Sequence, residues 1–198
     1  MMKKLICLSL TLVLISQTLF AQDYWGKDKF DGIKKVKFGI KAGTNIASID
    51  QGNSYDYNVG LGFYVGIVEE LILNDMLSLQ PEILFSRVGA KDKDDSSTTY
   101  ILDYLSIPLM LKVYFTDDIS FQMGPCFGFN LYSKGHNKAK TNNFTDVKKF
   151  DYSMALGAGY ELNDNFSITA RYSWGITEIR SKEDDRNSVF QLGACFKF

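Results

Sequence analysis

Apolar residues alternate with small or polar residues in eight separate segments of this chain, from Val36 to the last residue. The final segment shows the pattern well, because Phe190, Leu192, Ala194, Phe196 and Phe198 alternate with Gln191, Gly193, Cys195 and Lys197. A period of two is typical of a β-strand with two different faces, whereas an amphipathic helix repeats every 3.6 residues. We therefore predict an all-β protein with strands at residues 36–45, 58–68, 77–86, 104–115, 119–132, 151–162, 166–175 and 190–198.

The connections between the predicted strands alternate in length. The short ones are residues 69–75, 116–118 and 163–165. The long, polar ones are residues 49–57, 88–100, 133–150 and 175–188. Short turns at one end and long loops at the other indicate an up-and-down antiparallel barrel whose two ends face different surroundings. Strands of about ten residues are also long enough to cross a membrane when they are tilted.

The alternation leaves open which face of the sheet points into the barrel. A membrane barrel has its apolar face outside, whereas a soluble lipocalin-like barrel has it inside, around a ligand. Glycine favours the membrane barrel, because the mid-strand glycines fall on the polar face and a barrel of eight strands needs small residues inside. We therefore predict an eight-stranded antiparallel up-and-down transmembrane β-barrel over residues 36–198, in one domain. Its interfacial aromatic girdle is expected to comprise Tyr152, Tyr160, Phe166, Tyr172, Trp174 and Phe198.

Charged residues share the glycine-rich face of the predicted strands. They are Lys37, Lys41, Glu82, Lys112, Asp151, Glu161, Arg171 and Lys197. Because both signs are present, these side chains can pair in the lumen, where an unpaired charge would be costly. One interpretation is a paired plug that keeps a narrow barrel closed. The other is a small passage that favours anions, since basic residues are in excess; the narrowness of eight strands favours the plug.

Three prolines interrupt the predicted strands. Pro81, Pro108 and Pro125 cannot donate a backbone hydrogen bond, and a closed barrel has no free edge where that loss is harmless. We therefore expect a bulge or a broken ladder bond at each proline.

The N-terminus predicts export. Lys3 and Lys4 precede an apolar run that stops at Ala21, which is the pattern of a cleavable signal peptide over residues 1–21. Residues 22–35 then form an unassigned N-terminal segment, either a periplasmic tail or a short plug. No later stretch is apolar and long enough for a membrane helix, so a hydropathy profile alone would miss a membrane barrel.

The exported part of the chain is slightly acidic. The whole chain has 22 basic and 23 acidic residues, and two of the basic ones lie in the predicted signal peptide. This balance gives no reason to propose nucleic acid as a partner. The exported part keeps two cysteines, Cys126 and Cys195, on the predicted lumen face. We expect packed thiols there, with a single disulfide across the lumen as the alternative in an oxidising compartment.

Several of these segments together resemble a known family. FGIKAGTN, LSLQPEILFS, YLSIPLMLKVYF, MGPCFGF and QLGACFKF are similar to the PorT-like outer-membrane β-barrel proteins of Bacteroidota, over about Val36 to Phe198. The resemblance implies an outer-membrane barrel with its N-terminus and short turns in the periplasm and its long loops outside. The best-known member is associated with a secretion apparatus, so an accessory role in secretion is implied by the resemblance alone. The resemblance also implies that Phe196 and Phe198 belong to the signal read by the outer-membrane barrel assembly machinery.

No group of residues in the sequence indicates catalysis, a cofactor or a metal site. His136 is the only histidine and lies in a polar loop, and Asp92, Asp94 and Asp95 lack the ligand spacing of an EF-hand. We expect a structural or partner-binding barrel in outer-membrane lipid, whose envelope partners would contact loops 88–100, 133–150 and 175–188. A narrow channel for small solutes or anions is the second hypothesis. A soluble ligand-binding barrel or an outer-membrane enzyme is the third.

Overall fold

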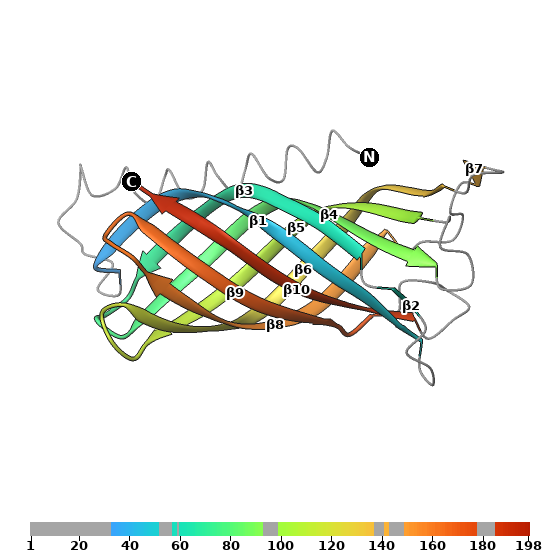
Figure 1. Ribbon diagram of the computed structural model, residues 1–198. Coiled ribbons are helices and arrows are strands. Elements are labelled where there is room, and N and C mark those ends of the chain that lie inside the picture. The colour runs from blue at the N-terminus through green and yellow to red at the C-terminus, as the bar shows by residue number, and fades with distance from the viewer. Residues whose placement is uncertain are drawn as a thin grey trace, which may run out of the picture. The chain divides into compact units, whose positions relative to one another are not determined.

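The computed structural model describes residues 33–51, 57–58, 60–92, 99–136, 141–142, 149–177 and 185–198. Within them lie eight long strands (Figure 1): β1 (Lys35–Gln51), β3 (Gly60–Ile72), β4 (Leu77–Asp92), β5 (Thr99–Tyr114), β6 (Ile119–His136), β8 (Phe150–Glu161), β9 (Phe166–Gly175) and β10 (Asp185–Lys197). Two short strands are added at the loop end, where β2 (Tyr57–Asn58) pairs with β4 and β7 (Thr141–Asn142) pairs with β6. No helix in the described part of the chain is long and apolar enough to cross a membrane.

The eight long strands form one closed antiparallel barrel. Each pairs with the long strand before it and the long strand after it, and β1 also pairs with β10, the last strand. The β1–β10 ladder runs from Gly39 opposite Lys197 to Gln51 opposite Asp185. Closure leaves none of the eight strands with an unpaired edge, which is what a sheet in lipid requires. The predicted eight-stranded up-and-down barrel is confirmed.

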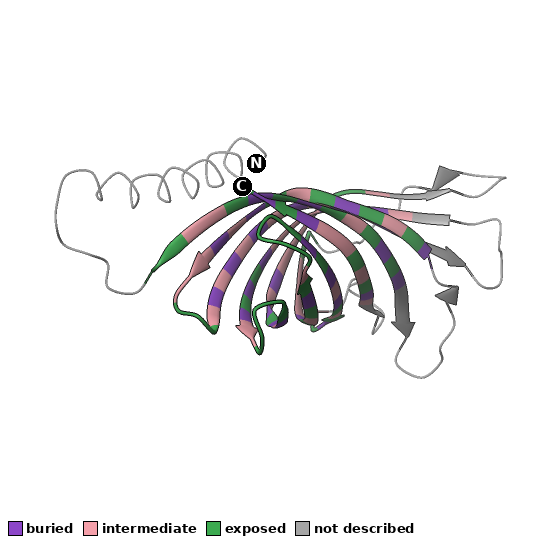
Figure 2. Cartoon of the chain, turned by 60° about the vertical axis from the view of Figure 1, so that its left-hand side comes forward, coloured by how far each residue is buried: buried purple, intermediate pink, exposed green. Residues whose placement is uncertain are grey.

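The two faces of the barrel differ in exposure, and Figure 2 shows buried and exposed residues alternating along the strands. Large apolar side chains point outward: Leu61 is 76% exposed, and Ile40 and Ile67 are more than half exposed. The inward face is buried and largely polar, with Asn45 and Lys112 among its residues. An apolar exterior around a polar interior is the arrangement of a membrane barrel, and a lipocalin-like barrel has the reverse. The soluble alternative is therefore wrong.

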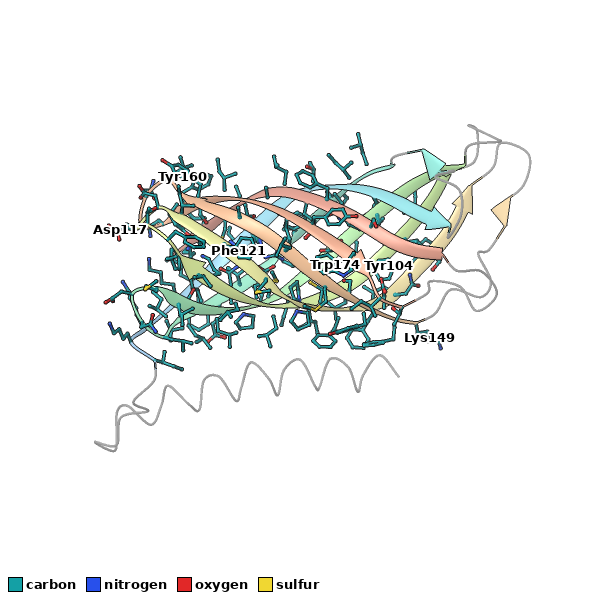
Figure 3. All side chains as sticks on the ribbon, turned by 90° about the horizontal axis from the view of Figure 1, so that it is seen from below. Tyr104, Asp117, Phe121, Lys149, Tyr160 and Trp174 are labelled. Carbon is teal, nitrogen blue, oxygen red and sulfur yellow. The ribbon has the colours of Figure 1, made fainter. Side chains whose placement is uncertain are left out.

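Aromatic side chains lie on the outer face near both ends of the barrel. The rings of Tyr172 and Trp174 stack with centroids 6.4 Å apart, toward the end that carries the long loops. Tyr160 and Phe166 lie on the outer face beside a short turn, at the opposite end. Figure 3 shows Tyr160 near Asp117 at the short-turn end, with Trp174 toward the other end. This distribution fits an aromatic girdle at two membrane boundaries.

Two inward glycines make room for a tyrosine in the lumen. Tyr64 of β3 pairs with Gly43 of β1, which in turn pairs with Gly193 of β10. A Cβ at Gly43 would lie 2.7 Å from Tyr64 Cζ, and a Cβ at Gly193 would overlap the Tyr64 hydroxyl. Tyr64 is only 2% exposed, so its ring packs against bare backbone of two neighbouring strands inside the barrel. The glycine-rich face is thus the inner face, as the sequence predicts.

The strands extend further toward the loops than the sequence predicts. β1 continues to Gln51, β4 to Asp92 and β6 to His136, while β5 begins at Thr99 and β10 at Asp185. The four predicted long loops are therefore too long. Alternation of polar and apolar residues marks a strand only where one face meets lipid, so it fades where the strands continue beyond the membrane.

Each proline interrupts one ladder without changing its register. Pairing of β4 with β3 is missing opposite Pro81, pairing of β5 with β4 is missing opposite Pro108, and pairing of β6 with β5 is missing opposite Pro125. Each gap covers two consecutive residue pairs. The expected broken ladder bonds are present at all three prolines, because a residue without an N–H cannot complete the pair. The one register shift in the described ladders lies elsewhere, on the β5–β6 pair between Asp103 and Tyr104.

Some predictions fall on residues that the structure does not describe. The signal peptide at residues 1–21 and most of the N-terminal segment 22–35 lie outside the described residues. Asp94 and Asp95 also lie outside them, and the side chains of His136 and Asp92 are not described. These assignments stay predictions.

Candidate functional site in the barrel lumen

The middle of the lumen holds a cluster of charged and amide side chains around Glu82, which we call the middle cluster: Lys41, Gln80, Glu82, Gln122 and Arg171. Lys41 Nζ lies 3.0 Å from Glu82 Oε1, and Arg171 binds both Glu82 oxygens at 2.7 and 3.0 Å. Gln80 donates to Glu82 at 2.6 Å, and Arg171 donates to Gln122 at 3.2 Å. These side chains come from β1, β4, β6 and β9, so the pairs cross the barrel. All five residues are 3% exposed or less.

A second cluster lies nearer the short turns and is called the turn-end cluster: Glu70, Lys112, Tyr114, Glu161 and Lys197. Lys112 and Lys197 each contact both carboxylates, with N–O distances between 2.8 and 3.1 Å. The Tyr114 hydroxyl donates to Glu70 at 2.6 Å and accepts from Lys112 at 2.7 Å. Two cations thus balance two anions, which is the condition under which buried charges are tolerated.

The lumen becomes apolar toward the long loops. Asn45 stands at the change: it donates to Ser86 Oγ at 2.9 Å and accepts from Gln191 at 2.9 Å. Beyond it, inward side chains near the loop ends of four strands pack together, and they are Ala47, Val88, Leu102, Tyr104 and Val189. Each is 8% exposed or less. The loop end of the lumen is therefore lined in part by packed apolar side chains, which hinder the entry of water and ions.

The structure divides the predicted lumen charges into separate groups. Lys41, Glu82 and Arg171 meet in the middle cluster, and Lys112, Glu161 and Lys197 meet in the turn-end cluster. Lys37 instead donates to the backbone oxygen of Asp164 at 3.1 Å, and Asp151 accepts from Thr177 at 2.7 Å. The eight predicted lumen charges therefore fall into two ion-pair clusters, and Lys37 and Asp151 belong to neither of them.

Sequence reasoning missed Glu70, although it is 1% exposed and contacts both lysines of the turn-end cluster. The sequence predicts a short connection over residues 69–75, whereas β3 continues to Ile72. The signal for the longer strand is in the sequence, because Tyr64, Gly66, Val68 and Glu70 continue the inward face with a period of two. The sequence places Gln80 and Gln122 on the lumen face but does not join them to a charged cluster.

The remaining candidate residues have simple positions. Cys126 and Cys195 are free, buried thiols. In the part of the chain that the structure describes, no group of three or more His, Cys, Asp or Glu side chains could hold a metal ion. Phe196 is 47% exposed on the outer face, and Phe198 is 72% exposed with its backbone N–H donating to Phe38 O at 2.8 Å.

Comparisons with known proteins agree with this architecture. Residues 20–181 match the family model described as outer membrane protein beta-barrel domain, and no curated protein matches the chain. The structure of Neisserial surface protein A is 15% identical and has a TM-score of 0.60, with 83% of this chain and 100% of that chain covered. A second similar structure is that of Ail, the attachment invasion locus protein of Yersinia pestis, in complex with the heparin analogue sucrose octasulfate. It is 15% identical and has a TM-score of 0.55, with 83% of this chain and 99% of that chain covered.

The two structural likenesses lie below 25% identity and therefore concern the fold. The family model covers most of the barrel, because residues 20–181 include β1 to β9 and end in the connection between β9 and β10. A closed barrel with a lipid-facing apolar exterior agrees with that match. The chain therefore belongs to the family of outer membrane protein β-barrel domains, and it is a small outer-membrane protein.

Proposed function

We propose that the protein is a closed, non-enzymatic barrel whose long loops serve as contact sites for other proteins of the cell envelope. The filled lumen is the observation that carries this proposal. Arg171, Lys112 and Lys197 are each 2% exposed or less, and all three pair with carboxylates on strands that are not adjacent to their own. Separating a buried charge from its partner costs about 3–5 kcal/mol. A passage through this lumen would break several such pairs together and would also have to part the apolar cluster.

Electrical recording tests the closed lumen. The purified protein, folded in detergent, is added to planar lipid bilayers in 1 M KCl, and a large porin serves as the conducting control, since wide barrels have aqueous channels. We expect membrane insertion without stable single-channel steps. Insertion is checked by recovering heat-modifiable protein from vesicles of the same lipid. A reproducible open state of the wild-type protein would contradict the closed barrel.

Loop replacement tests the partner-binding part of the proposal. Residues 93–98, 137–148 and 178–184 are replaced one at a time by short turns, and correct folding is checked by heat-modifiable migration. We expect at least one replacement to abolish cross-linking to a specific envelope protein while the barrel still reaches the outer membrane. If all three folded variants kept the same cross-links as the wild type, the loops would not be the contact sites.

A narrow channel that favours anions is the second candidate. The observation in its favour is the middle cluster, where Lys41 and Arg171 share the single carboxylate Glu82. Under a KCl gradient, such a channel would show a reversal potential of the sign expected for chloride. The Lys41→Gln variant would reduce that preference, whereas the exposed Lys34→Gln variant would leave it unchanged.

The resemblance to PorT-like proteins supports a more specific form of the first proposal, an accessory role in secretion. Deleting the gene would then lower the amount of exported proteins outside the cell without lowering their synthesis. A strain with normal secretion would remove this specific form and leave the closed barrel intact. The same resemblance supports recognition of the last strand by the barrel assembly machinery.

A further inference from the structure

The lumen contains hydrogen-bond donors that the protein itself does not satisfy. Among the described buried side chains, four polar atoms lack a hydrogen-bond partner: Asn130 Nδ2, further along β6, and a group of three, Ser120 Oγ, Gln122 Nε2 and Arg171 Nε. Ser120 is 0% exposed, Gln122 1% and Arg171 2%, so bulk water does not reach them directly. Leaving such a group unpaired costs about 1–3 kcal/mol, more when it is charged, and native proteins rarely leave several together.

These three atoms belong to one region of the barrel wall. Ser120 and Gln122 lie on β6, opposite Gly159 and Gly157 of β8. Arg171 of β9 pairs with the same Gly157. Ser120 Oγ and Gln122 Nε2 both lie 2.7 Å from the point where a Cβ on Gly159 would stand, so the ends of the two side chains pack side by side against the backbone of Gly159. The Arg171 guanidinium reaches the head of the Gln122 side chain, at 3.2 Å from its Oε1.

The same region lacks one negative charge. Lys41 and Arg171 are both cations with side chains 2% exposed, and the only carboxylate that contacts them within the described residues is Glu82. The turn-end cluster, by contrast, balances two lysines with two glutamates. A buried excess charge is strongly unfavourable in a low-dielectric interior. A water molecule would satisfy the donors but would leave the charge uncompensated.

We propose that a small monovalent inorganic anion, chloride in an ordinary buffer, binds inside the lumen between β6, β8 and β9. Arg171 Nε, Gln122 Nε2 and Ser120 Oγ donate to it, and its charge balances the second cation of the middle cluster. The ion is a bound structural component that stabilises the closed barrel. This site is independent of the proposed partner-binding function, because it lies inside the lumen and uses none of the loops.

The first experiment measures stability against chloride concentration. The folded protein in uncharged detergent is unfolded with urea while sodium gluconate is replaced stepwise by sodium chloride at constant ionic strength; gluconate is a much bulkier anion than chloride. Above the dissociation constant, each tenfold rise in chloride is expected to raise the folding equilibrium constant tenfold. Equal unfolding midpoints in gluconate and chloride would overturn the proposal.

Two buried serines provide a matched pair of variants. Ser120 and Ser78 are both 0% exposed, and Ser78 Oγ donates to Glu70 in the turn-end cluster. Ser120→Ala is expected to raise the chloride dissociation constant, fitted from the dependence of stability on chloride, roughly fivefold, the effect of one lost hydrogen bond. Ser78→Ala is expected to lower stability but to leave that dissociation constant unchanged. An equal shift in both variants would overturn the assignment of the site.

A third variant supplies the missing charge. Gln122→Glu places a carboxylate beside Arg171 and is expected to remove the chloride dependence. If that variant did not fold, crystals of the wild-type protein grown in bromide would decide instead. An anomalous peak in contact with Ser120, Gln122 and Arg171 is expected, and no peak there at saturating bromide would overturn the proposal.

Discussion

Lys197, the residue before the C-terminus, places its Nζ 2.8 Å from Glu70 Oε2. The two residues lie on β10 and β3, which are separated by β1, so the contact bridges β1 on the inner face of the barrel. Lys197 also binds both oxygens of Glu161 on β8. Backbone hydrogen bonds therefore hold β10 to its neighbours β1 and β9, and the ion pairs of Lys197 hold it to β3 and β8.

Replacing Lys197 with alanine should be strongly destabilising. Glu70 and Glu161 would then share the single cation Lys112, and loss of one partner from a buried ion pair costs about 3–5 kcal/mol. The free energy of unfolding is measured by urea titration in detergent. Lys34→Ala is the control, because Lys34 pairs with Asp75 through side chains that are 57% and 93% exposed, and such a pair contributes about 1 kcal/mol or less. Comparable losses in the two variants would show that the turn-end cluster contributes little.

Gly193→Ala should impair folding, whereas Gly128→Ala should be tolerated. A Cβ at Gly193 would overlap the Tyr64 hydroxyl and the backbone oxygen of Ala42, which cannot both move away. At Gly128 the nearest atoms would be 3.4 Å or more from the new Cβ, which is ordinary contact. Overpacking of this kind costs about 1–3 kcal/mol. Heat-modifiable migration and the urea midpoint measure the difference, and equal behaviour would contradict the packing of Tyr64 on Gly193.

Ile67→Arg should destabilise the barrel in lipid by about 2–4 kcal/mol, the cost of a charge on the lipid face near the middle of the bilayer. Ile67 is 52% exposed on the outer face in the middle of β3. Met76→Arg is the control, since Met76 is 60% exposed in the turn between β3 and β4, where the charge meets water. The measurement is the urea midpoint in phospholipid vesicles. An unchanged urea midpoint for Ile67→Arg would show that this part of the outer face does not contact lipid.

Deleting Phe198 should reduce the amount of folded barrel in the outer membrane more than any loop replacement does. The deletion removes an exposed aromatic ring and the hydrogen bond from Phe198 N–H to Phe38 O. Phe115→Ala, which also removes an aromatic ring, 70% exposed, at the short-turn end, is the control. The folded fraction is read from heat-modifiable migration of outer-membrane samples. Normal assembly of the shortened chain would show that the terminal aromatic residue is dispensable.

Much of the fold could be read from the sequence because lipid imposes a local rule. A residue such as Ile67 must be apolar and its neighbour Gly66 must face inward, so the period of two and the position of glycine together predict the strands and their orientation. The same rule does not operate beyond the membrane. The loop ends of β4 and β5 therefore extend beyond the predicted strands, and Val88 and Leu102 lie outside those strands although both side chains are buried in the lumen.

The sequence by itself determined the barrel, the number of its strands, its inner and outer faces and most of the charges in the two lumen clusters, but not Glu70. It did not determine which charges meet. The choice of partners depends on the stagger between strands. It places Lys41 and Arg171 beside Glu82. It places Lys112 and Lys197 beside Glu70 and Glu161. Pairing inside the lumen is a property of the folded sheet, because the partners are 36 to 127 residues apart in the chain and lie on strands that are not adjacent.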